Sequence, residues 1–385
     1  MTDRHTTTAE DELQALPPPS RPAREFWRLL KANRMALAGL AIFAAFLVVA
    51  VAGLILTGGD HPYLDPAQVR LVEKLRPPLS RPDLDNLPPE VRPAMGIYLL
   101  GTDDLGRDVF ARMLQGAWVS LTVGFVAVGI SVAIGILFGG LAGYFGQRAV
   151  RTTHLTAAVA VTAAIGLAAT DKPVWAAVAS AAALVSCLLI VKQRYAQEPL
   201  PRGKFWQARL VTVDTLIMRL VDIMLCFPSF FLILTVVALL PPSLYAIMIV
   251  IGLTSWMGTT RFVRAEFLAL REQDFVAAAK ALGVSSGRII FRHMMPNAVG
   301  PVLVSATIGI ASAILTEAGL SFLGFGVPPP HATWGNILSD GKRFIFDAPW
   351  LTFAPGIVIL VVVLAFNLFG EGLRDILNPK LRERS

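Results

Sequence analysis

The sequence predicts an all-α polytopic membrane protein, and three observations support this fold class. The 385-residue chain is 55% hydrophobic and only 16% charged, whereas about a quarter of the residues in soluble domains are charged. Apolar runs near twenty residues recur along it, which is the length that a helix needs to cross roughly 30 Å of hydrocarbon. The basic residues behind the +7 net charge sit in short segments beside these runs. That distribution is typical of cytoplasmic loops and argues against nucleic-acid binding.

The N-terminal part predicts a tail, an anchor and a first span. Residues 1–34 are expected to form a cytoplasmic tail that ends in an interfacial helix, because Trp27 and Leu30 alternate with basic residues there. Residues 35–57 are apolar throughout and predict the first transmembrane helix. Residues 58–117 are Pro-rich and mixed in charge, and we expect them to form an extracytoplasmic loop.

The transmembrane core is predicted over residues 118–370 and begins with a span at 118–144. Gly135, Gly139 and Gly143 recur in it at four-residue spacing. In membranes such a row of small residues lets helices approach closely, so these glycines predict helix packing.

Further spans are expected at 215–240, 245–262, 298–323 and 350–369, and residues 371–385 form a second cytoplasmic tail. The first of these spans contains Pro228 in its middle. Arg219 and Asp222 lie near its inner end, and their spacing predicts an ion pair.

An insert at residues 147–213 separates the second and third of these spans. It contains two Ala-rich apolar runs joined only by residues 170–173, and basic residues flank both ends. We expect an extra transmembrane hairpin with both ends inside. A re-entrant or surface-lying pair of helices is the alternative.

A polar loop, residues 263–297, lies between two predicted spans. Phe275, Ala278, Ala279 and Leu282 fall on one face of a short helix. Gly283 is expected to end this helix in the left-handed conformation. Ser285 or Ser286 can then begin a second short helix, which we expect to end at Pro296. An element with this mixed character is expected to dock onto another protein.

The triplet 277–279, Gly283 and the pair 295–296 resemble the "EAA" loop of permease subunits in ATP-binding-cassette importers. Residues 101–108, 318–326, 334–336 and 365–367, together with 378–379, add to the resemblance. The chain is similar to the C-type permeases of the dipeptide, oligopeptide and nickel group. Two departures are Ala277 in place of a frequent Glu, and His293 in place of the usual Ile.

This resemblance implies a six-helix type I permease fold in the bacterial inner membrane, with both termini cytoplasmic. It implies that the loop couples to an ATPase through Phe275, Ala278, Ala279, Leu282, Gly283, Arg288 and Pro296. The implied partners are a homologous second permease, two ATPase subunits, an extracytoplasmic solute-binding protein and membrane lipid. The implied cargo is a di- or oligopeptide, with nickel, glutathione or opines as alternatives.

No enzymatic function is predicted for this chain. A phosphate-binding loop needs Gly, four residues, Gly, Lys and then Ser or Thr, but the stretch from Gly335 to Lys342 has one residue too many. ATP and Mg²⁺ are therefore expected on partner subunits, with no cofactor on this chain. The five histidines have no metal-ligand spacing, so no metal site is predicted. A secondary transporter and a membrane-embedded enzyme are the rival classes.

Two polar residues fall inside predicted spans, where such groups are costly and often functional. Glu317 and Asn367 are candidates for the translocation path. The alternative for each is a structural hydrogen bond between helices.

Overall fold

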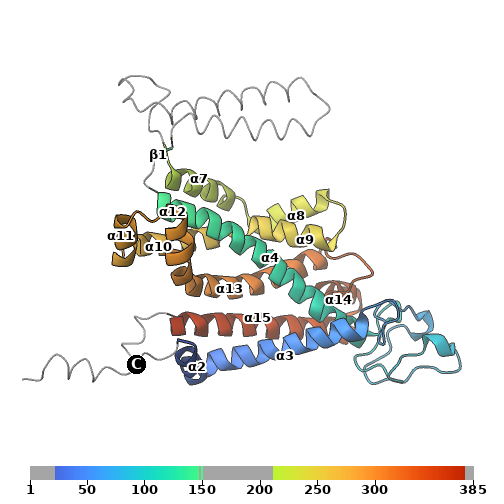
Figure 1. Ribbon diagram of the computed structural model, residues 1–385. Coiled ribbons are helices and arrows are strands. Elements are labelled where there is room, and N and C mark those ends of the chain that lie inside the picture. The colour runs from blue at the N-terminus through green and yellow to red at the C-terminus, as the bar shows by residue number, and fades with distance from the viewer. Residues whose placement is uncertain (1–21, 147–148, 151–210, 378–385) are drawn as a thin grey trace, which may run out of the picture. The chain divides into compact units, whose positions relative to one another are not determined.

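The computed structural model describes residues 22–146, 149–150 and 211–377, which form two compact units of helices (Figure 1). The first unit contains the chain up to Ser131, together with Ser229–Ser255 and the chain from Val299 on. The second contains Val132–Pro228 and Trp256–Ala298.

The first unit is built around two long antiparallel helices. Its helices are α2 (Pro22–Ala32), α3 (Arg34–Thr57), the first part of α4 (Val109–Phe145), α8 (Ser229–Leu239), α9 (Leu244–Thr254), most of α13 (Met295–Phe322), α14 (Trp334–Gly341) and α15 (Trp350–Leu377). Figure 1 shows α3 and α15 side by side. A Cβ built on Gly39 of α3 would lie 2.6 Å from the backbone nitrogen of Phe369 in α15. Small residues therefore let these two backbones approach closely.

The second unit contains the rest of α4, α7 (Val213–Leu225), α10 (Trp256–Arg271), α11 (Asp274–Ala281), α12 (Ser286–Arg288) and the π-helix η4 (Ile289–Met294). The glycine row of α4 faces α10. A Cβ at Gly135 would lie 2.6 Å from Thr259, and one at Gly139 would lie 2.7 Å from the carbonyl oxygen of Thr260. A Cβ at Gly143 would collide with the side chain of Phe267.

Four of the described helices, α3, α4, α13 (together with α12 and η4) and α15, are long and apolar enough to cross a membrane. The number rises to six if α7 with α8, and α9 with α10, each count as one span. The predicted span 215–240 is not one continuous helix, because it is interrupted before Pro228, where proline removes a backbone donor. The predicted span 245–262 is interrupted at Ser255.

Two helices are longer than expected. Helix α4 begins at Val109, so residues 109–117 are helical and do not belong to the loop before it. The carboxylate of Asp108 accepts a hydrogen bond from the backbone N–H of Phe110 at 2.9 Å, which caps this early start. Helix α15 continues to Leu377, past the predicted end of the core at 370.

The ends of the insert meet in a short antiparallel ladder. Strand β1 (Ala149–Val150) pairs with β2 (Val211–Thr212), with Ala149 opposite Thr212. The predicted transmembrane hairpin itself lies at 151–210, outside the described residues. The ladder therefore brings the two flanks of the insert together.

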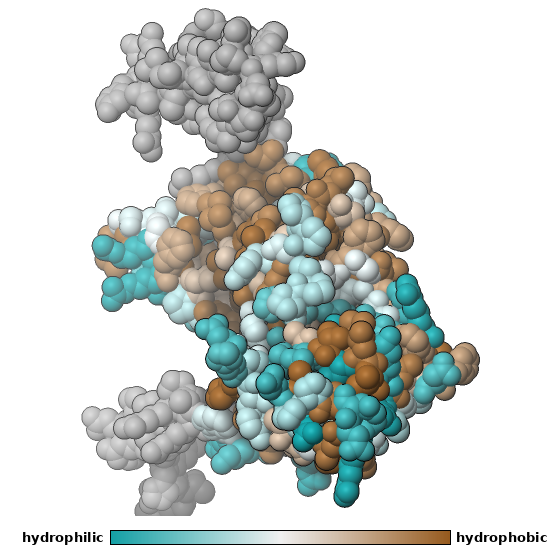
Figure 2. Space-filling model, turned by 90° about the vertical axis from the view of Figure 1, so that its right-hand side faces the viewer, coloured by the Kyte–Doolittle hydropathy of each residue, from teal (hydrophilic) through white to brown (hydrophobic). Residues whose placement is uncertain are grey.

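The segment 58–108 contains only short 3₁₀ turns, η1 (Leu71–Glu73) and η2 (Pro89–Val91), and is held by buried charges. Asp103 is fully buried and accepts hydrogen bonds from Arg107 at 2.7 Å and Arg112 at 2.6 Å. Both arginines also reach Asp340 at the end of α14. Burial raises the pKa of Tyr98 in this segment to about 12. Figure 2 looks onto the face that carries the segment, where hydrophilic and hydrophobic side chains mix.

Candidate functional site

The loop after α10 closes its first helix with a defined hydrogen-bond pattern. The backbone N–H of Val284 donates to the carbonyl oxygen of Ala279, and that of Gly283 donates to Lys280, both at 3.0 Å. These two bonds form a Schellman motif, which requires a left-handed residue after the helix. Gly283 has φ of 72°, so the prediction that it ends the helix in this conformation is confirmed.

The predicted docking face is divided by the structure. Leu282 is 83% exposed and Phe275 is 39% exposed, and Ala278 is also exposed. Ala279, in contrast, is buried within this chain, as is Val276 one turn earlier. Ala279 therefore packs inward, and the expectation that it lies on the docking face is wrong. Helical periodicity alone does not decide this, because Ala279 lies three or four positions from buried Val276 and from exposed Phe275 and Leu282 alike.

The second half of the loop does not end at Pro296. Ser285 precedes α12 without making a side-chain cap. The chain then continues through the π-helix η4 into α13 as one helical stretch from Ser286 to Phe322. Within it the N–H of Met295 bonds to the carbonyl oxygen of Ile290. Pro296 follows this wide π-helical turn as the second residue of α13. A proline has no N–H to donate to the preceding turn, and such irregular turns are where helices accommodate prolines. Arg288 and Pro296 are both exposed.

A basic hollow lies beside α11 within the second unit. Its volume is about 400 Å³, and its lining includes Tyr144, Arg271, Lys280, Val284 and Ile289. The ammonium of Lys280 lies 5.9 Å from the centre of the Tyr144 ring, a cation–π distance. Sequence reasoning missed this hollow, because Tyr144 is far from the loop in sequence.

The acidic residues of α7 form ion pairs with the neighbouring helix α10. Asp222 accepts a hydrogen bond from Arg261 of α10 at 2.7 Å, so the predicted pair with Arg219 is wrong. Asp214 accepts two hydrogen bonds from Arg264 of α10.

The two polar candidates inside the spans differ in their surroundings. Glu317 is 1% exposed, and its carboxylate accepts a hydrogen bond from the hydroxyl of Ser321 at 2.6 Å. Glu317 is therefore buried inside this chain, and its bond to Ser321 lies within α13 and not between helices. Asn367, in contrast, is exposed on α15, so no other part of the described chain covers its side chain.

These long apolar helices define a multi-pass helical membrane protein. Residues 205–383 match the family described as "Binding-protein-dependent transport system inner membrane component". Residues 21–89 match the "N-terminal TM domain of oligopeptide transport permease C".

Full-length relatives agree with these matches. The dipeptide transport system permease protein DppC of Alkalihalophilus pseudofirmus is 34% identical over 94% of this chain and 91% of its own length. The dipeptide transport system permease protein DppC of Haemophilus influenzae is 33% identical over 95% of this chain and 97% of its own length. The di/tripeptide transport system permease protein DppC of Pseudomonas aeruginosa is 32% identical over 99% of both chains. The chain belongs to the family of permease subunits of binding-protein-dependent ATP-binding-cassette importers.

Proposed function

We propose that this permease subunit imports di- or oligopeptides, and that its loop 263–297 docks onto a partner ATPase. The peptide cargo is supported by the names of its relatives, which are permeases of dipeptide, di/tripeptide and oligopeptide transport systems. Nickel, glutathione or opine import remains the alternative within the same group.

The observation that carries the docking proposal is the exposure of Leu282. An 83% exposed leucine next to a rigid Schellman turn costs free energy in water, and a hydrophobic groove on a partner would recover it. Exposed Phe275 and Ala278 extend this surface along α11. Arg288, which is also exposed, adds a positive charge after the turn at Gly283.

In this proposal, ATP and Mg²⁺ bind to two ATPase subunits, which hydrolyse the nucleotide. A homologous second permease completes the path, and an extracytoplasmic solute-binding protein delivers cargo. Both termini and the loop 263–297 lie in the cytoplasm, and the segment 58–108 lies outside. The basic residues of the loop favour this orientation.

Coupling then follows from motion of the docked loop. Closure of the ATPase pair on binding ATP would move α11 and switch the cavity between the permeases from inward- to outward-facing. Cargo would be released from the solute-binding protein into that cavity.

The test is to co-express the chain with the products of its neighbouring genes, purify the complex and reconstitute it. We expect ATP hydrolysis that is stimulated by solute-binding protein loaded with a dipeptide. Stimulation by a nickel-loaded receptor and not by peptide would move the cargo to the alternative. A chain that purifies alone and moves solute without ATP would contradict the docking proposal.

A further inference from the structure

Helix α2 packs against the long helices of the first unit through one side only. Leu30 is 1% exposed and forms a buried cluster with Ala36 of α3 and Ile376 of α15, and Leu29 packs against the same cluster. Figure 1 shows α2 at the start of α3 and beside the end of α15. Leu30 is therefore taken up by this chain itself and does not anchor α2 in lipid.

The other side of α2 is exposed and carries an aromatic residue among cations. Trp27 is 52% exposed, and Arg28 and Lys31 are exposed as well. Residues three or four apart share a helix face, so Lys31 lies beside both of the others. Arg34, the first residue of α3, is also exposed. These four residues form a cationic face, and its half-exposed indole costs free energy if it remains in water.

The cations of this face have no acidic partner among the described residues, because they take part in none of the ion pairs found there. The acidic residues at the end of α15, Glu371 and Asp375, both lie near Arg374, at 3.6 and 3.8 Å. Residues 22–35 include four basic residues and one acidic residue, Glu25, a net charge of +3. The cationic face therefore has an excess of positive charge.

The length of α3 places the cationic face at the level of lipid headgroups. Helix α3 has 24 residues and is apolar enough to cross a membrane, and at 1.5 Å per residue it is about 36 Å long. The hydrocarbon core is roughly 30 Å thick, so both ends of α3 reach the membrane surface. Only Asn33 separates α2 from α3, and its Oδ1 caps α3 by accepting the N–H of Ala36 at 3.1 Å. Helix α2 is therefore held at that surface.

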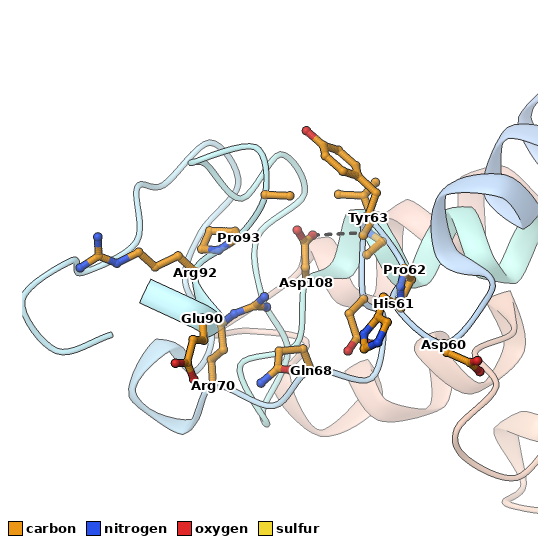
Figure 3. A pocket seen from close by; sticks show the side chains of 14 residues that line it. Asp60, His61, Pro62, Tyr63, Gln68, Arg70, Glu90, Arg92, Pro93 and Asp108 are labelled. Carbon is orange, nitrogen blue, oxygen red and sulfur yellow. Dashed lines mark hydrogen bonds between the residues drawn. The ribbon is translucent and has the colours of Figure 1, made fainter. Parts of the chain in front are cut away.

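The opposite end of α3 has a different charge pattern. It leads into the segment 58–108, where Figure 3 shows a polar pocket lined by residues of both signs. Arg70 and Arg92 are accompanied there by Asp60, Glu90 and Asp108. The pocket thus contains its own counter-charges, whereas the cationic face at the start of α3 does not.

We propose that the cationic face binds anionic phospholipid headgroups, with Arg28 and Lys31 at the phosphates and the Trp27 ring at the boundary with the acyl chains. Each Lys or Arg near an anionic membrane surface strengthens attachment about fivefold. Indole rings prefer this boundary because they have an apolar body and a polar N–H. The inference concerns α2 and lipid, so it depends neither on the cargo nor on the ATPase docking proposed above.

The test uses the full-length chain in phosphatidylcholine nanodiscs that contain either brominated phosphatidylglycerol or the same fraction of brominated phosphatidylcholine. Bromine on the acyl chains quenches a nearby indole, and comparison with Trp27→Phe separates Trp27 from the other tryptophans of the chain. We expect phosphatidylglycerol to be favoured at Trp27 about fivefold or more. Added salt should weaken this preference, because it screens exposed charges.

Arg28→Gln combined with Lys31→Gln should abolish the preference for phosphatidylglycerol. Lys74→Gln combined with Arg81→Gln is the matched control, since it removes one Lys and one Arg from exposed positions of the segment 58–108, and it should keep the preference. Arg28→Lys with Lys31→Arg preserves both charges and should also keep it. Thermal melting checks that each variant is folded, and if the first pair does not fold, Arg28→Gln and Lys31→Gln are measured singly and should each lower the preference.

Three results would overturn the proposal. Trp27 could be quenched equally by the two brominated lipids, or by neither. The preference could survive in folded variants that lack Arg28 or Lys31. Finally, quenching of Trp27 could disappear in the complex purified with the products of the neighbouring genes, which would mean that a partner subunit and not lipid covers the cationic face.

Discussion

The backbone N–H of Val284 donates a hydrogen bond to the carbonyl oxygen of Ala279 at 3.0 Å, and this bond presents Leu282 to solvent. The bond requires Gly283 to keep a positive φ, a conformation that costs other residues about 1 kcal/mol or more. The exposed surface of α11 therefore depends on one glycine.

Gly283→Asp should abolish the stimulation of ATP hydrolysis by loaded solute-binding protein while leaving the chain inserted in the membrane. The substitution strains the turn and places a charge beside the apolar docking surface. Gly287→Asp is the control, since Gly287 has no positive φ and no neighbour within 4 Å of an added Cβ. A Gly283→Asp complex with normal coupling and transport would rule out the role proposed for this turn.

Leu282→Ser should weaken association with the ATPase subunits without lowering the melting temperature of the isolated chain. The leucine is 83% exposed, so this chain gains little from it. Burying a leucine in a partner contributes about 1.5–3 kcal/mol, so we expect roughly a tenfold or greater loss of affinity. Co-purification and titration of the ATPase measure this effect. Ala281→Ser, an exposed neighbour, should change neither quantity, and equal affinities for Leu282→Ser and wild type would refute the contact.

Gly139→Leu should destabilise the second unit. Even a Cβ at this position would lie 2.7 Å from Thr260 and Val263 of α10, and overpacking of this kind costs about 1–3 kcal/mol. Thermal melting in detergent measures the loss. Gly129→Leu in the same helix has no neighbour within 4 Å of an added Cβ, and should melt close to the wild type. If both variants melt alike, α4 and α10 do not depend on this close contact.

Asp103→Asn should loosen the segment 58–108. Asp103 is fully buried between Arg107 and Arg112, and removing one partner of a buried ion pair costs about 3–5 kcal/mol. Limited proteolysis of the purified chain should cut the variant faster within this segment. Asp85→Asn, at an exposed position of the same segment, should leave the cleavage rate unchanged. Protection equal to the wild type in Asp103→Asn would show that the charge network is dispensable.

The sequence was sufficient for the fold class and for most helices, because both depend on local properties. Runs of apolar residues locate the helices α3, α4, α13 and α15 from length alone. The turn at Gly283 was also predictable, since only glycine adopts a positive φ at no cost. The family followed from short motifs whose residues are close in sequence.

Only the tertiary structure decided how residues distant in sequence are paired. It placed Arg261 and not Arg219 beside Asp222, turned Ala279 inward, carried the helix past Pro296 and joined the flanks of the insert at Ala149 and Thr212. Periodicity predicts which residues share a helix face, but which neighbour covers that face depends on packing between segments that the sequence keeps far apart.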